Sequence, residues 1–359
     1  MKLHRLLLLF IFFGISINIQ AQEIHYTLYN MSPLTLNPAQ TGAFYGTVRL
    51  GGIFRSQWFS VDDNLGYETP SFYVDAPIIR GFREQDWVGV GAVIVNDRAG
   101  SLGLRNNGTF ISAAYHLGLG KKGDNVLTLG IQGGSVQRSF IGGNRIRSAN
   151  RFDGTTFLDS AAPDNMADNV LGGGGAGGNS DKSTQNYLDF GAGLMFKSQI
   201  DKSSNLELGV AVDNVNQPED AFRAVNNAQD NEDRKPMRIA AHARYQFPLG
   251  KKLFMAPTAL FQTQRGANEF NFQAWAGYLF DPEREITFNF GLGYRVGDAA
   301  KVLAGADIKD IRVAASFDLN VSQYRTATDY QGAFEVAAWY IIKKYKKPNV
   351  KPAILCPKF

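Results

Sequence analysis

The stretch 286–296 reads ITFNFGLGYRV and alternates between apolar residues and small or polar ones at every position. One face carries Ile286, Phe288, Phe290, Leu292, Tyr294 and Val296, and the other carries Thr287, Asn289, Gly291, Gly293 and Arg295. Successive side chains of a β-strand point to opposite faces, so a period of two predicts a strand with one apolar and one wet face.

The same alternation recurs along the chain and predicts about fourteen strands. They cover 47–59, 70–79, 87–98, 107–118, 125–138, 187–199, 206–215, 237–247, 253–264, 269–280, 286–297, 299–309, 311–321 and 332–343. Most are as long as the ~9–11 residues that a tilted strand needs to cross a membrane, whereas globular strands average about 5–6. An even strand count also suits a bacterial outer-membrane barrel. The sequence therefore predicts an all-β fold, a transmembrane antiparallel barrel over residues 47–343 in the cell outer membrane.

A β-sandwich or a propeller is the alternative fold, because its strands also alternate. Its inward faces need large aliphatic side chains, whereas the wet faces here carry Gly, Arg, Asn, Gln and Asp. The apolar faces are rich in Phe and Tyr near the strand ends, where membrane barrels place aromatic girdles. The barrel is the favoured interpretation.

The predicted connections fall into two sets. One set is short, at about 80–86, 119–124, 200–205, 248–252, 281–285 and 310, and the other includes the two longest, 139–186 and 216–236. Outer-membrane barrels have short periplasmic turns and long outer loops. We therefore expect both chain ends and the short turns in the periplasm.

The chain ends carry their own signals. Lys2, Arg5 and a short apolar run ending at Ala21 predict a signal peptide over residues 1–21. Residues 22–46 are expected to be a non-barrel segment at the periplasmic mouth or a plug in the lumen. Residues 344–359 are expected to be a lysine-rich periplasmic tail.

Composition excludes several classes of protein. A single cysteine, Cys356, cannot form an intramolecular disulfide, and one Cys with four scattered His offers no zinc cluster. Beyond the signal peptide, the six lysines of 343–359 leave a body with 29 basic and 33 acidic residues. That distribution argues against a nucleic-acid-binding face.

No G-x-S-x-G, H-E-x-x-H or C-x-x-C motif occurs in the sequence, and the glycine-rich run 171–178 is followed by Asn179-Ser180-Asp181 instead of the Lys-Ser/Thr of a phosphate loop. The three histidines outside the signal peptide, His25, His116 and His242, lie on different segments. An outer-membrane hydrolase stays a minor alternative, because members of a catalytic triad need not be adjacent in sequence. We expect a protein without enzymatic activity, cofactor or metal.

Both ends of the predicted mature chain resemble one known family. The opening is His25-Tyr-Thr-Leu-Tyr-Asn30, then Ser32-Pro-Leu-Thr-Leu-Asn-Pro-Ala39, Gly42, Arg49 and Phe54-Arg-Ser-Gln-Trp58; the close is Gly332-Ala-Phe-Glu-Val336 and Ile354-Leu-Cys-Pro-Lys-Phe359. These motifs resemble the PorP/SprF family of type IX secretion outer-membrane proteins.

The resemblance implies a role in protein secretion in bacteria of the Bacteroidota. The implied partners are the type IX machinery, a periplasmic peptidoglycan-linked protein, the C-terminal domain of a cargo protein and outer-membrane lipid. Support of gliding motility through export of an adhesin is among the implied roles. The alternative is a passive porin or a channel for hydrophobic small molecules.

Eight residues are candidates for binding a partner or for forming a plug: Tyr26, Tyr29, Asn37, Pro38, Arg49, Arg55, Gln57 and Trp58. Asn37-Pro38 predicts an extended or turn conformation at residue 37. Arg49, Arg55 and Gln57 share one face of the first strand, with Phe54 and Trp58 on the other. An arginine facing lipid at the bilayer midplane costs about 2–4 kcal/mol, so we assign Arg55 to the lumen. There it either pairs with an acid such as Asp75 or Asp318 or contacts a partner.

Overall fold

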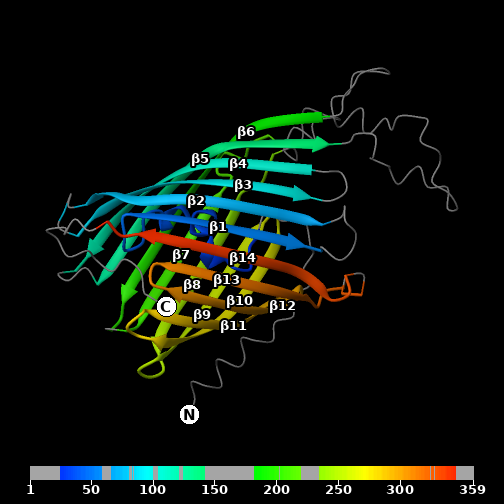
Figure 1. Ribbon diagram of the computed structural model, residues 1–359. Coiled ribbons are helices and arrows are strands. Elements are labelled where there is room, and N and C mark those ends of the chain that lie inside the picture. Colours follow the sequence, from blue (N-terminus) through cyan, green and yellow to red (C-terminus); the bar gives the residue numbers. More distant parts are fainter. Residues whose placement is uncertain are drawn as a thin grey trace, which may run out of the picture.

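The computed structural model describes residues 25–58, 66–80, 83, 85–99, 104–120, 124–141, 182–201, 203–219, 234–323, 325–326 and 328–344. Its strands form one closed barrel in which each strand pairs antiparallel with its neighbours in sequence (Figure 1). The strands are β1 (Val48–Gln57), β2 (Tyr67–Arg80), β3 (Trp87–Ala99), β4 (Leu104–Leu119), β5 (Asn125–Ile141), β6 (Lys182–Gln199), β7 (Asn205–Asp213), β8 (Arg238–Pro248), β9 (Leu253–Gln264), β10 (Ala267–Asp281), β11 (Ile286–Arg295), β12 (Ala299–Ile308), β13 (Ile311–Asn320) and β14 (Gln331–Ile342).

All fourteen predicted strands are confirmed, and the fold is the expected barrel. β1 and β14 close it in register from Val48 opposite Ile342 to Gln57 opposite Ala333. Because this sheet closes on itself, the sandwich and propeller alternatives are wrong.

The two faces of the wall have the chemistry that the alternation predicts. Large apolar side chains face outward, with Ile111 71%, Phe72 67% and Leu292 67% exposed. Arg49, Arg55 and other polar side chains of the inner face are buried inside the barrel. An apolar exterior around a polar interior is the arrangement of a membrane barrel.

The barrel has two distinct ends. At the terminal end β1 begins and β14 finishes, and the backbone N–H of Thr47 donates to the carbonyl of Ile342 at 2.7 Å. The opposite end, here called the loop end, carries the two long connections, 142–181 and 214–237, as expected from their parity. The predicted signal peptide 1–21, the residues 345–359 with Cys356, and most of both long connections lie outside the described residues.

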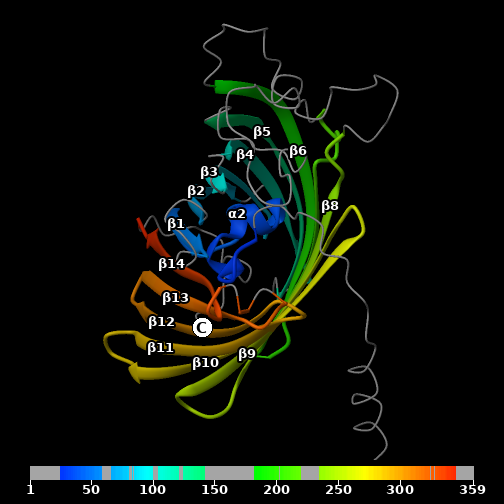
Figure 2. The same cartoon turned by 90° about the vertical axis from the view of Figure 1, so that its right-hand side faces the viewer.

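Three short helical elements lie within the barrel. They are η1 (Tyr29–Met31), α2 (Pro33–Leu36) and η2 (Pro38–Gln40), and Figure 2 shows them surrounded by the wall. Among the described residues, no helix has the length and apolarity to cross a membrane.

Candidate functional site

Residues 25–46, here called the plug segment, fill much of the lumen. The apolar side chains of Tyr26, Leu28, Met31 and Leu34 are buried in one cluster with wall residues. The wall members include Ile53, Tyr73, Val93, Val95, Trp275, Leu303 and Trp339. Burying one Leu or Phe side chain contributes about 1.5–3 kcal/mol, so this cluster holds the segment firmly.

Thr27 is the centre of a buried polar cluster. Its hydroxyl contacts both carboxylate oxygens of Asp318 at 2.8 Å and accepts from Nη2 of Arg295 at 3.1 Å. Its carbonyl accepts from Nε2 of Gln273 at 2.7 Å. Because Asp318, Arg295 and Gln273 come from β13, β11 and β10, one plug residue ties three strands together.

Glu335 on β14 binds the plug backbone and Arg55 at once. Its Oε1 accepts the N–H of Thr27 at 2.6 Å, and its Oε2 accepts the N–H of Leu28 at 2.7 Å. Arg55 forms a buried ion pair with Glu335 and lies 3.6 Å from the carboxylate of Asp318. Arg55 therefore faces the lumen and pairs with acids of the wall.

Arg49, near the terminal end of β1, also pairs with an acid of the wall beside the plug segment. Its Nε and Nη2 donate to both carboxylate oxygens of Asp75, at 2.9 and 2.8 Å, and the pair is buried. The second oxygen of Asp75 also accepts the N–H of Gly42 at 2.7 Å, and Nη2 of Arg49 lies 3.3 Å from the carbonyl of Gln40. Both arginines thus contact the plug segment and pair with wall acids.

Asn37 fixes the middle of the plug segment. It is extended, with φ −159° and ψ 119°, and its Oδ1 accepts the N–H of Ala39 at 2.9 Å, which caps η2 after Pro38. Its Nδ2 lies 3.3 Å from the carbonyls of Leu194 and Val210, and 3.2 Å from Nε2 of His242.

Glycines of the wall make room for this turn. A Cβ on Gly193 would lie 1.9 Å from Oδ1 of Asn37, and one on Gly130 would lie 2.3 Å from the backbone nitrogen of Ala39. A Cβ on Gly89 would lie 2.2 Å from the carbonyl oxygen of Thr41. The wet-face glycines therefore form a groove in the wall that receives the plug backbone.

His116 and Trp87 hold the terminal end of the plug segment. Their rings stack with centroids 4.4 Å apart. Nε2 of His116 lies 2.8 Å from the carbonyl of Thr41, and Nε1 of Trp87 donates to the carbonyl of Gly42 at 3.0 Å. Both His116 and His242 thus have structural hydrogen bonds to the plug segment.

The remaining candidates take different positions. Tyr29 is buried and donates its hydroxyl to Oγ1 of Thr258 at 2.8 Å, while Gln57 accepts from Nη2 of Arg55 at 3.0 Å. Trp58 lies after β1 at the loop end and packs edge-on against Tyr67, with centroids 5.3 Å apart. Trp58 has a left-handed backbone, with φ 58°, and lies beyond the alternating residues of β1.

His25, at the start of the plug segment, lies outside the strands. Burial, reinforced by the positive charge of Arg295, lowers the pKa of His25 to about 4. The imidazole is therefore neutral at pH 7.

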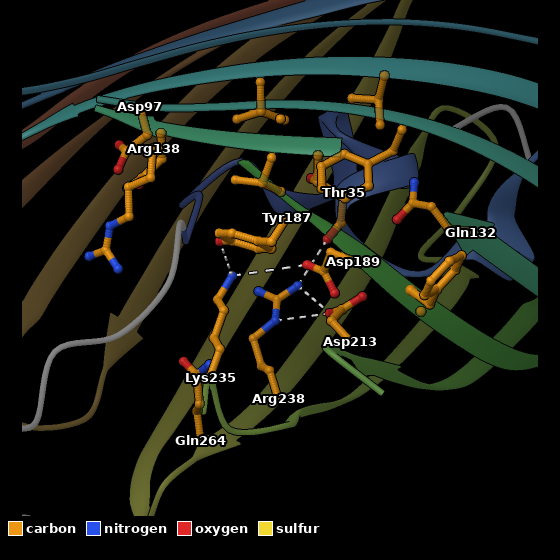
Figure 3. Close-up of a pocket in the computed structure, with 18 of the residues that line it drawn as sticks. Thr35, Asp97, Gln132, Arg138, Tyr187, Asp189, Asp213, Lys235, Arg238 and Gln264 are labelled. Atoms are coloured by element: carbon orange, nitrogen blue, oxygen red, sulfur yellow. Dashed lines mark hydrogen bonds and ion pairs between the residues drawn. The ribbon is translucent and has the colours of Figure 1, made fainter. Parts of the chain in front are cut away.

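A cavity of about 390 Å³, here called the vestibule, opens beside the plug segment toward the loop end. Figure 3 shows Thr35 of α2 lining it together with side chains of the wall. Val93, Val95 and Val136 supply an apolar side, and Tyr187, Asp189, Asp213, Lys235 and Arg238 supply a polar side.

Two ion pairs line the vestibule, Arg238 with Asp213 and Lys235 with Asp189 (Figure 3). Nη2 of Arg238 lies 2.6 Å from the carboxylate of Asp213 and donates to the carbonyl of Thr35 at 3.2 Å. Nζ of Lys235 lies 4.0 Å from the carboxylate of Asp189 and 3.3 Å from the hydroxyl of Tyr187. Among the described residues, no group of three His, Cys, Asp or Glu side chains is placed to hold a metal ion.

Sequence patterns did not identify the vestibule. Alternation assigns Asp189 and Asp213 to the lumen-facing side of their strands. It does not predict where along the barrel the plug segment leaves a cavity. Thr27 and Glu335 were also missed as contact residues, although both lie inside the quoted family motifs.

Several solved structures are similar to this chain. The toluene transporter TbuX of Ralstonia pickettii has a TM-score of 0.47 at 11% identity, covering 87% of this chain and 94% of TbuX. A FadL homologue of Pseudomonas aeruginosa has a TM-score of 0.43 at 11% identity, and the match covers 86% of this chain and 94% of the homologue. The translocator domain of the autotransporter NalP from Neisseria meningitidis has a TM-score of 0.41 at 10% identity, and the match covers 88% of this chain and 96% of that domain.

No curated protein sequence matches the chain. The family model for the type IX secretion system membrane protein PorP/SprF matches residues 18–340, nearly the whole length. This match spans the barrel and includes the motifs at residues 25–58 and 332–336, whereas the motif at residues 354–359 lies beyond it. The chain belongs to the PorP/SprF family of type IX secretion system membrane proteins and is a β-barrel of the outer membrane.

Proposed function

We propose that this protein is a non-enzymatic component of type IX secretion that acts by binding other proteins. The C-terminal domain of a cargo protein would bind at the loop end, and the periplasmic machinery, including a peptidoglycan-linked protein, would bind at the terminal end. Export or surface attachment of an adhesin used in gliding is one form of this role. Family membership supports the secretion role, and the filled lumen supports binding over conduction.

The filled lumen is the observation that carries this proposal. Leu28, Leu34 and Phe44 are each at most 1% exposed, and Thr27 and Glu335 are fully buried. A passive porin or a channel for hydrophobic molecules needs an open path, and the plug segment occupies the position where such a path would run. Moving it would expose the charges of Arg55, Asp318 and Glu335 without their plug partners.

The vestibule supports protein binding at the loop end. It combines an apolar side with aromatic and charged groups, the mixture that anchors side chains at protein interfaces. A partner would gain from apolar and aromatic contacts with Phe110, Val136 and Tyr187.

Deleting the gene and comparing the secreted and surface proteins with those of the parent strain tests the role. We expect loss of one or more type IX cargo proteins, restored by the wild-type gene. Complementation with Tyr187→Ala should restore less than complementation with Val302→Ala, since Val302 lies on the outer face of β12, away from both ends of the barrel. An unchanged set of secreted and surface proteins after deletion would contradict the proposal.

A further inference from the structure

The loop-end half of β6 has a neighbouring strand on one side only. β6 pairs with β5 along residues 182–198. Its pairing with β7 covers residues 192–199 and goes no farther toward the loop end. Within the part of the chain that the structure describes, no strand pairs with residues 182–191 on the β7 side.

The pairing with β7 stops because the chain turns directly after Asp213, the last residue of β7. Asn214 and Gln217 have left-handed backbones, with φ 55° and 43°, and the N–H of Gln217 donates to the carbonyl of Asn214 at 2.9 Å. A left-handed residue does not continue an extended strand. The chain therefore leaves the side of β6 at this turn.

Asn216 takes the place of a neighbouring strand just beyond the turn. Its Oδ1 accepts the N–H of Phe190 at 3.2 Å, and its Nδ2 donates to the carbonyl of Leu188 at 2.8 Å. Leu188 and Phe190 are 60% and 48% exposed on the apolar outer face, where lipid leaves backbone groups without water. An amide, the chemistry of a peptide bond, therefore completes this side of β6 where the wall is apolar.

The next residues of β6 toward the loop end present backbone groups on the same side. Successive residues of a strand direct their N–H and C=O groups to alternate sides, so Thr184 and Asn186 direct theirs as Leu188 and Phe190 do. The side chains of Thr184 and Asn186 are exposed and polar. Residues 183–190, STQNYLDF, include no Pro or Lys, which protect many natural sheet edges from pairing.

We propose that residues 182–190, here called the β6 edge, bind an extended segment of a protein at the loop end by strand addition. The inference rests on the proposed function for the class of partner, an exported cargo protein. An extended polypeptide presents N–H and C=O groups on one side at every second residue, about 6.4–6.8 Å apart. This repeat matches the groups of Thr184, Asn186 and Leu188. Main-chain hydrogen bonds then supply affinity, and the adjacent side chains supply specificity.

The vestibule lies beside the β6 edge and would receive alternate side chains of the added strand. Tyr187 and Asp189 point into it and contact Lys235 (Figure 3). Neighbouring strands place paired residues on the same face of a sheet. Every second side chain of the bound segment would therefore enter the vestibule, and the others would face outward.

A second copy of this chain does not fit the same edge. Two copies in one membrane hold their β6 strands at the same height. The terminal-end half of the second β6 would then lie beside residues 192–199, a position that β7 fills. The edge fits a chain that turns away at the level of Asn216, as a segment of a separate protein can.

Photocrosslinking in the native bacterium tests strand addition. The photoreactive amino acid p-benzoylphenylalanine replaces Thr184 at the β6 edge or, as the matched control, Arg98 on β3. Thr184 pairs with Ser139, Ser139 with Arg105, and Arg105 with Arg98, so the control lies on the same rung of the sheet. Both Thr184 and Arg98 are exposed. We expect an adduct from position 184, and none from position 98, whose crosslinked peptide belongs to an exported protein.

Two substitutions test whether the backbone of β6 makes the contact. Asn186→Pro removes the N–H that points away from β5 and leaves the pairing with β5 in place, whereas Asn186→Ala keeps that N–H. Because a lost hydrogen bond leaves a carbonyl of the bound strand unpaired, we expect Asn186→Pro to lower the adduct from position 184 about tenfold. Asn186→Ala should leave it unchanged, with both variants compared at equal amounts of folded barrel. Equal adducts from the two variants would overturn strand addition.

The identity of the crosslinked peptide decides between the possible occupants of the β6 edge. An adduct with residues 142–181 or 220–233 of the same chain, with a second copy or with a protein that is not exported would overturn the proposal, as would no adduct at position 184. Unchanged secretion after deletion of the gene contradicts the secretion role. A missing adduct together with lost secretion contradicts strand addition alone.

Discussion

Arg55 and Glu335 lie directly opposite each other in the register of β1 and β14, and their side chains form a buried ion pair across the seam that closes the barrel. The same carboxylate accepts two backbone N–H groups of the plug segment. The Glu335 side chain therefore contributes both to the seam between β1 and β14 and to docking of the plug segment.

Glu335→Gln is expected to lower the free energy of unfolding by about 3–5 kcal/mol, because it leaves the buried charge of Arg55 without its main partner. Denaturant titration of the purified barrel in detergent micelles measures the loss. Glu68→Gln is the matched control, since Glu68 and Arg98 are half-exposed and 3.9 Å apart, and such pairs contribute about 0–1 kcal/mol. Equal losses for the two variants would contradict the role of Glu335.

Gly193→Ala is expected to destabilise the barrel by about 1–3 kcal/mol, the usual cost of overpacking. Its added Cβ would lie 1.9 Å from Oδ1 of Asn37, whereas one on Gly133 of the neighbouring strand would meet the ring of Phe190 at 2.9 Å. Phe190 is exposed and its ring can turn away. A lower unfolding temperature for Gly193→Ala than for Gly133→Ala supports the groove, and the reverse order would refute it.

Asn37→Asp is expected to loosen the plug segment more than Tyr29→Phe does. The aspartate cannot donate to the carbonyls of Leu194 and Val210 and places a negative charge beside them. Tyr29→Phe removes one hydrogen bond, to Thr258, which contributes about 0.5–1.5 kcal/mol. The two variants are compared by the temperature at which each loses its folded band in electrophoresis. A larger decrease in this temperature for Tyr29→Phe would be inconsistent with the central role of Asn37.

Docking of the plug segment is expected to weaken as the pH falls from about 6.5 to about 4. Burial beside Arg295 lowers the pKa of His25 to about 4, and a released histidine has a pKa near 6.5. The undocked state therefore binds a proton first, so stability is unaffected above this window and falls within it. The difference in unfolding free energy between wild type and His25→Gln, measured against pH, reports the contribution of the His25 imidazole. A difference that does not change with pH would contradict a role of His25 protonation in weakening the docking.

The fold was predictable because alternation is local: each strand shows its apolar face in its own residues. The predicted strand boundaries were less accurate where the residues at a strand end lack an apolar face. β6 begins at Lys182 instead of 187, since residues 182–186 are polar and remain in the sheet by pairing with β5, from Ile141 opposite Lys182 onward.

The site was predictable only in part. The lumen-facing assignment of Arg49 and Arg55 follows from alternation, and their partners Asp75 and Asp318 were among the acids expected. The plug segment has no such period, so its depth and direction depend on contacts with residues far along the chain, such as Thr27 with Glu335. The vestibule is the space that this packing leaves.

Electrical conductance in planar lipid bilayers tests most directly whether the plug segment closes the lumen. The wild-type protein is expected to show no large steady conductance, and a variant lacking residues 25–41 is expected to conduct. A large steady conductance of the wild-type protein, equal to that of the deletion variant, would contradict a closed lumen and favour a passive channel.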